Sequence, residues 1–64
     1  DALFDEKFSL DEHLAARERD IIIRALVASG GVQARAARRL GINQRSLWHR
    51  IKKFNIDVSS IRKQ

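Results

Sequence analysis

Polar and basic side chains recur between Asn43 and Lys53, and their types suit hydrogen bonding rather than bond-making chemistry. Arg45 and His49 are four residues apart, so a helix places them on one face, one turn apart. A guanidinium can offer two parallel N–H donors to a guanine edge in a major groove, and the imidazole can reach a neighbouring base or phosphate. The sequence assembles no Ser/His/acid set, metal-spaced histidine cluster or glycine-rich phosphate loop, so we expect no catalysis, cofactor or metal.

The charges of the chain are divided unevenly between its two halves. Residues 1–31 carry four Lys or Arg and seven Asp or Glu, whereas residues 32–64 carry nine Lys or Arg and one Asp. The net charge of the whole chain is +5. The basic half predicts a polyanionic partner, and a merely solvated basic surface is the alternative. Because the sequence has no cysteine and no apolar run near the ~20 residues that span a bilayer, we expect a soluble, cytoplasmic protein.

The candidate side chains must be held by helices, because the chain is rich in helix-forming residues and has no proline. Ser9 opens a capping box with Glu12, in which each side chain satisfies a free backbone N–H. Gly30 suits the left-handed residue that closes a helix. A first, long helix is therefore predicted over residues 9–29.

Two shorter helices should follow, over residues 33–40 and 44–54. Gly41 can end the former, Asn43 is well suited to cap the latter, and Asn55 tolerates the left-handed conformation that would close it. Helices joined by so short a turn predict a helix-turn-helix. The expected fold is a small all-α domain of three helices.

The apolar residues of the first helix cover more of its circumference than one face. An inward stripe is predicted at Leu10, Leu14, Ile21, Ala25 and Leu26. Two short helices cannot cover the remaining arc, and a domain this small without disulfides usually needs a further source of stability, so we predict a homodimer. Its interface is expected to comprise Leu14, Ile21, Ile22, Ile23 and Val27. The alternative is that all of them form one intramolecular core.

The third predicted helix divides its residues between core and solvent. Leu47, Ile51 and Phe54 share the inward side, and the free side comprises Arg45, Ser46, His49, Lys52 and Lys53. Trp48 lies at the margin of the core side, where a packed ring whose indole N–H reaches a phosphate or carbonyl is favoured over base insertion. Phosphate contact or simple solvation is expected for the remaining basic residues, which are Arg35, Arg38, Arg39, Lys52 and Lys53.

The run from Ala36 to Ile56, AARRLGINQRSLWHRIKKFNI, resembles the Fis-type helix-turn-helix. The resemblance extends over about residues 10–57 and is to the C-terminal domain of NtrC-type, sigma-54-dependent transcriptional activators. It implies a bacterial, nucleoid-associated domain that binds double-stranded DNA as a dimer at inverted-repeat, enhancer-like sites. An AAA+ ATPase domain that contacts sigma-54 RNA polymerase would precede it. By this resemblance the DNA-contacting residues are Asn43, Gln44, Arg45, Ser46, His49 and Arg50.

Two departures from the family pattern fall at helix ends. Val32 stands where an asparagine commonly caps the second helix, and Asn55 stands where a glycine commonly ends the third. The first departure puts that helix start in question, and the second is mild.

The domain itself is expected over residues 9–57, with residues 1–8 as a lead-in and residues 58–64 as a flexible tail. Since the chain begins at Asp1 and has no methionine, we expect it to be part of a longer protein or a processed chain. Two other functions remain open. One is a free-standing Fis-like nucleoid protein, and the other is a helical module whose basic face docks an acidic protein.

Overall fold

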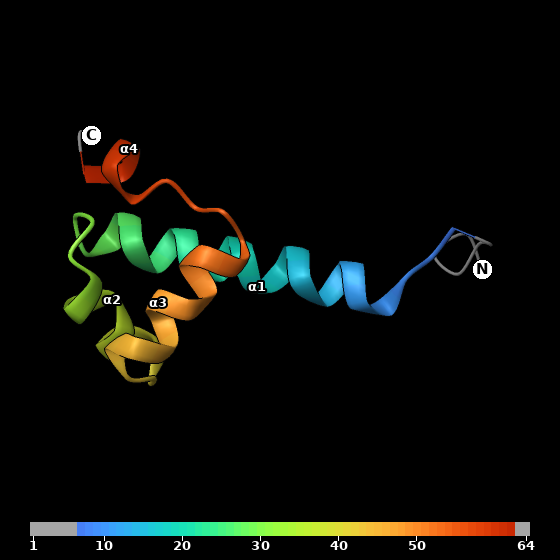
Figure 1. Ribbon diagram of the computed structural model, residues 1–64, viewed down its shortest axis with the longest axis horizontal. Helices are drawn as coiled ribbons and strands as arrows, with labels where there is room; N and C mark the ends of the chain where they lie inside the picture. The colour runs from blue at the N-terminus through green and yellow to red at the C-terminus, as the bar shows by residue number, and fades with distance from the viewer. Residues whose placement is uncertain (1–6, 63–64) are drawn as a thin grey trace.

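The computed structural model describes residues 7–62, and these form four α-helices and no strand. The helices are α1 (Leu10–Ala28), α2 (Gln33–Leu40), α3 (Gln44–Lys53) and α4 (Val58–Arg62). The second half of α1 lies with the other helices, whereas its first half extends away from them (Figure 1). The predicted all-α fold with a helix-turn-helix is confirmed, and a fourth helix is added to the three expected. Most of the predicted lead-in, residues 1–6, lies outside the described residues.

Helix α1 begins where the sequence predicts. Ser9 has an extended backbone (φ −129°, ψ 117°), and its hydroxyl accepts a hydrogen bond from the N–H of Glu12. Asp11 and Glu12 lie in the first turn, where negative charge complements the helix dipole. Although α1 is long, no helix within residues 7–62 has the length and apolar character needed to cross a membrane.

The three longer helices end in the same way. Each is followed by a residue with positive φ, and these are Gly30 (62°), Gly41 (71°) and Asn55 (53°). In each case the next residue's N–H donates back to a carbonyl five residues earlier: Gly31 to Leu26, Ile42 to Ala37, and Ile56 to Ile51. This closure satisfies carbonyls that the helix leaves free and turns the chain sharply. It keeps the link between α2 and α3 to three residues, which sets the helix-turn-helix.

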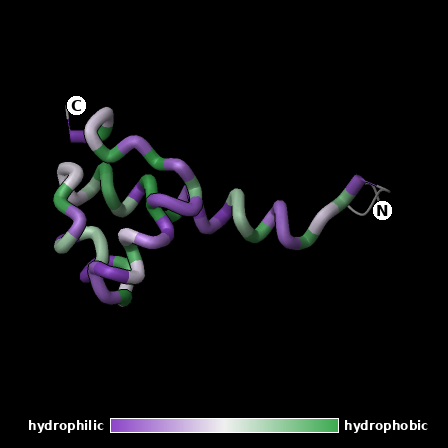
Figure 2. The backbone as a smooth tube through the Cα atoms, in the orientation of Figure 1, coloured by the Kyte–Doolittle hydropathy of each residue, from purple (hydrophilic) through white to green (hydrophobic). Residues whose placement is uncertain are grey.

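The core lies where α1, α2 and α3 converge. Its buried side chains are Ile22, Leu26, Ala36, Ala37, Leu47, Ile51 and Ile56. The two alanines of α2 present little bulk, so neighbouring helices can approach closely. Figure 2 shows apolar residues gathered in this part of the molecule, whereas apolar and polar residues alternate along the projecting half of α1.

The predicted inward stripe of α1 is only partly right. Leu26 is buried and Ala25 packs against the core, but Leu10, Leu14 and Ile21 are 61%, 58% and 49% exposed. Leu10 lies at the start of α1, in the half that projects beyond the other helices, and Leu14 lines an open groove that leaves it largely in water. Ile22, which we had placed in the dimer interface, is instead a core residue at 2% exposure.

The C-terminal segment differs from the flexible tail that we expected, because Val58–Arg62 forms α4. The Asp57 carboxylate accepts hydrogen bonds from the hydroxyl of Ser59 and the N–H of Ser60. The Ser59 hydroxyl above all, with the Ser60 amide, holds the pKa of Asp57 below its ordinary value. Val58 and Ile61 pack against the core, and α4 lies against α1. Tertiary packing therefore orders a segment whose local sequence pattern is weak.

Candidate nucleic-acid interface

Helix α3 presents one apolar side and one basic side. Leu47 and Ile51 are 0% and 6% exposed, so this side faces the core. The exposed residues of the helix include Gln44, Arg45, His49, Lys52 and Lys53. Arg45 and His49 are thus on the free side, one turn apart, as the sequence predicts. The arrangement offers hydrogen-bond donors along a helix narrow enough to enter a DNA major groove.

Asn43 is used to begin α3. Its backbone is extended (φ −79°, ψ 162°), and its side-chain oxygen accepts a 2.7 Å hydrogen bond from the N–H of Ser46. The capping role predicted for Asn43 is therefore confirmed. Because the amide oxygen is engaged, the NH₂ group is what Asn43 retains for a phosphate or base.

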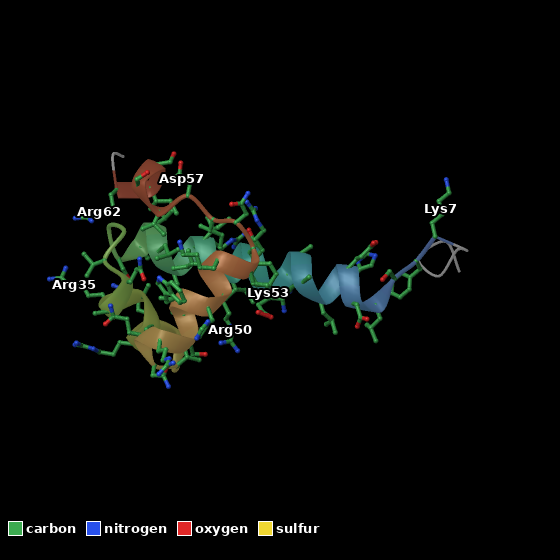
Figure 3. The ribbon with its side chains drawn as sticks, viewed as in Figure 1. Lys7, Arg35, Arg50, Lys53, Asp57 and Arg62 are labelled. Atoms are coloured by element: carbon green, nitrogen blue, oxygen red, sulfur yellow. The ribbon has the colours of Figure 1, made fainter. Side chains whose placement is uncertain are left out.

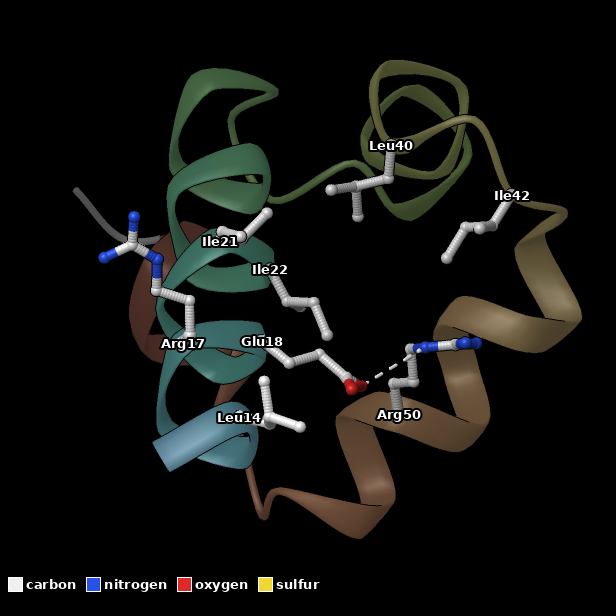
Figure 4. Close-up of a pocket in the computed structure, with 8 residues that line it drawn as sticks. All are labelled: Leu14, Arg17, Glu18, Ile21, Ile22, Leu40, Ile42 and Arg50. Atoms are coloured by element: carbon white, nitrogen blue, oxygen red, sulfur yellow. Dashed lines mark ion pairs between the residues drawn. The ribbon is translucent and has the colours of Figure 1, made fainter. Parts of the chain in front are cut away.

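Arg50 points toward α1, on the flank of α3. Its Nε lies 3.4 Å from Oε2 of Glu18, and the pair faces across the space between the two helices (Figure 4). The same guanidinium donates to the carbonyl oxygen of Ser46, at 3.3 Å, and to the Ser46 hydroxyl. The resemblance implied DNA contacts for Arg50 and Ser46. In the structure these two residues are hydrogen-bonded to each other, and Arg50 also pairs with Glu18 of α1.

Trp48 is more exposed than a packed edge aromatic would be, at 47%. Lys52 Nζ lies 5.5 Å from the centroid of the indole, and the ring of His49 meets it edge-on at 5.1 Å. These contacts join Trp48 to the free side of α3, which the sequence analysis did not expect. Lys53 is exposed at the C-terminal end of α3, where its Nζ lies 5.2 Å from the ring centroid of Phe54.

Positive charge continues onto α2. Arg35, Arg38 and Arg39 are exposed and line one shallow surface hollow, and Arg35 extends outward from α2 (Figure 3). Residues 32–56 contain no Asp or Glu, so neither helix of the helix-turn-helix carries a carboxylate of its own. This surface therefore attracts anions, and no carboxylate within α2 or α3 competes for its basic side chains. No side chain caps the start of α2, because Val32 stands where a capping asparagine is common in the family pattern.

Two residues of α1 that approach α3 were not found from the sequence. Glu18 pairs with Arg50, and Arg19 Nε donates to the carbonyl oxygen of Phe54 at 3.5 Å. Partners this distant along the chain leave no periodic or spacing pattern, so only the fold brings them together.

An apolar groove separates α1 from the turn between α2 and α3. It has a volume of about 500 Å³, and Figure 4 shows its lining residues: Leu14, Arg17, Glu18, Ile21, Ile22, Leu40, Ile42 and Arg50. Of the predicted interface residues, Leu14, Ile21 and Ile22 line this groove, although Ile22 is a core residue and only 2% exposed. Ile23 is half-buried against the core, whereas Val27 is 52% exposed and about 120° around the helix from Ile21. The five predicted residues therefore do not form one surface.

Comparisons with known proteins agree with this geometry. Residues 13–54 match the family described as "Bacterial regulatory protein, Fis family". The chain is 47% identical over 51 residues to a "Nif-specific regulatory protein" of Azotobacter chroococcum mcd 1. The matched region covers 80% of this chain but 38% of that relative, so the chain spans well under half of the relative's length. No solved structure matches the chain.

Proposed function

This chain belongs to the Fis family of bacterial regulatory proteins and is a helix-turn-helix DNA-binding domain, and on that premise we propose that it recognises a specific inverted-repeat site as a homodimer. The observation that carries the proposal is the free side of α3. There Arg45 and His49 are exposed one turn apart on a surface without carboxylates.

In the proposed complex the N-terminal half of α3 enters the major groove. Arg45, in the first turn, donates two parallel N–H groups to a guanine edge, and His49 reaches the next base or a phosphate. Gln44 and the Asn43 amide lie close enough to the helix start to contact the backbone. Lys53 lies two turns later, where the helix has risen toward the phosphates. Recognition of the DNA sequence is thus assigned to the start of α3, and sequence-independent binding to the phosphates is assigned to its end.

The dimer is proposed to form through α1 and the apolar groove. Leu10, Leu14 and Ile21 leave large apolar surfaces in water, and contiguous apolar patches of this kind mark protein–protein contacts. The groove beside them is lined by Leu40 and Ile42, so a helix from a second copy would find apolar side chains on both walls. Burial there would supply stability that a domain of this size lacks by itself.

We further propose that the domain tethers a sigma-54-dependent activator to enhancer-like sites. This rests on the resemblance of about residues 10–57 to the C-terminal domain of NtrC-type activators and on the similarity to a protein named "Nif-specific regulatory protein". The remainder of such a protein would contribute an AAA+ ATPase domain that contacts sigma-54 RNA polymerase. The assembly would act on the bacterial chromosome.

The direct test is selection of duplexes from a random library by the 64-residue chain. The selected duplex and a scrambled one are then titrated at several salt concentrations. We expect an inverted repeat with half-sites about one helical turn apart, or closer if the DNA bends, and tighter binding of the selected duplex. Equal affinity for both duplexes would contradict specific recognition and favour a general nucleoid protein.

A further inference from the structure

The ion pair between Glu18 and Arg50 supplies a carboxylate that the helix-turn-helix itself lacks. Arg50 Nε lies 3.4 Å from Glu18 Oε2, and both side chains are about 40% exposed. The guanidinium is shared, because it also donates to the carbonyl oxygen and the hydroxyl of Ser46, one turn earlier in α3. Glu18 is therefore connected through one side chain to the first turn of α3.

Helix α3 meets α1 through side chains, which are the core residues of both helices and two polar contacts outside the core. Backbone contacts are most extensive between α1 and α2, between α2 and α3, and between α1 and α4. Between α1 and α3, Arg50 reaches Glu18 and Arg19 reaches the Phe54 carbonyl at the C-terminal end of α3. Two consecutive residues of α1 thus contact α3 at two points along its length. Such a pair of contacts resists rotation of α3 about its own axis.

We propose that Glu18 is a positioning residue, which holds the start of α3 through Arg50 and Ser46 in the orientation that presents Arg45 to DNA. The inference rests on the proposed function, because it concerns how the same helix is aimed. Ser46 is adjacent to Arg45, so a rotation that moves one moves the other. In this role Glu18 never touches DNA, and Arg50 contributes from within the protein rather than as a base contact.

Whether E18Q weakens or strengthens DNA binding distinguishes a positioning role of Glu18 from a purely electrostatic one. Removing a negative charge from a DNA-binding domain should strengthen its attraction to phosphates. If Glu18 positions α3, then E18Q should weaken binding to the selected duplex, while binding to the scrambled duplex stays the same or tightens. Exposed ion pairs of this kind are worth about two- to fivefold, so we expect a loss of that size per half-site.

Asp20 provides a matched control on the same helix. It pairs with Arg24 within α1, at 3.0 Å, and both side chains are largely exposed. D20N removes the same charge without touching α3, so it should not weaken binding to either duplex. In an R50M background, E18Q should cause no further loss of binding to the selected duplex, because its route to Ser46 is already cut.

The experiment combines titrations of both duplexes with NMR spectra of the free 64-residue protein. The expected result is that E18Q, but not D20N, shifts the Arg50 Nε–H and Ser46 amide resonances and lowers affinity for the selected duplex alone. The inference is overturned if E18Q leaves those resonances in place, if it behaves as D20N does on DNA, or if both duplexes and the melting temperature fall together, as for a merely structural residue. Failure of the wild-type chain to prefer the selected duplex would instead refute the proposed function, and the NMR comparison would still decide whether Glu18 holds Arg50.

Discussion

Ile21 and Ile22 are neighbours in α1 with opposite surroundings, so replacing each by alanine should have different consequences. Ile22 is 2% exposed and lies in the core, whereas Ile21 is 49% exposed at the apolar groove. Truncating a buried isoleucine costs about 2–5 kcal/mol, because it removes buried methylene groups and leaves a cavity. Ile21→Ala should lower the free energy of unfolding by about 1 kcal/mol at most and leave no cavity, because half of the Ile21 surface is already in water.

These magnitudes are large relative to the whole. A chain of 64 residues is expected to have a free energy of unfolding of about 3–10 kcal/mol. Ile22→Ala should therefore lower the urea midpoint strongly at every protein concentration. Ile21→Ala should change it little at low concentration, where the chain is monomeric, and more at high concentration, where the proposed dimer forms.

Urea titrations followed by circular dichroism measure the first effect, and sedimentation equilibrium measures the second. Ile21→Asp should keep the fold and reduce the apparent mass to that of the monomer, since its carboxylate would face the groove. Equal shifts of the urea midpoint for Ile21→Ala and Ile22→Ala at low concentration would refute the assignment of Ile22 to the core and Ile21 to the surface. An Ile21→Asp protein with the parent's mass would refute the groove as the dimer interface.

Three further comparisons test other parts of the structure. Arg45→Ala should cost about 1–3 kcal/mol per half-site and relax preference at one base pair, whereas Lys53→Ala should weaken all sequences alike and reduce the salt slope by about 0.9 per lost phosphate contact. Titrations on selected and scrambled duplexes distinguish the two, and equal losses on both duplexes for Arg45→Ala would show a backbone contact. Gly31→Ala should destabilise the domain more than Gly30→Ala in thermal unfolding. Both have positive φ, which costs about 1–2 kcal/mol, but only the former would drive a Cβ into α4. For Asp57, whose folded pKa is lowered, the stabilisation should be complete above the unfolded pKa of about 3.9 and lost as pH falls through the folded value. The difference in melting temperature between the parent and Asp57→Ala should therefore shrink below about pH 4, and a constant difference would contradict the cap.

Local sequence patterns were sufficient to predict most of the secondary structure. The bounds of α2 and the first residue of α3 agree with the expectation, because Gly41 and Asn43 act through hydrogen bonds within a few residues of themselves. The same holds for Ser9 at the start of α1. The exposure of Arg45 also follows from helical spacing once Leu47 is placed in the core.

Long-range packing decided what the sequence left open. Helical spacing gives the angle between Ile21 and Ile22, but which of them is buried depends on where α2 and α3 reach α1. The helix at Val58–Arg62 likewise depends on the core that receives Val58 and Ile61, because so short a segment is not stable as a helix by itself. The pairing of Glu18 with Arg50 has no local pattern at all, since it arises only when α1 and α3 are folded together. The sequence alone therefore determined the three longer helices and the basic character of the DNA-binding side. The tertiary structure decided whether α4 forms, which residues are core, which line the groove and which hold α3 in place.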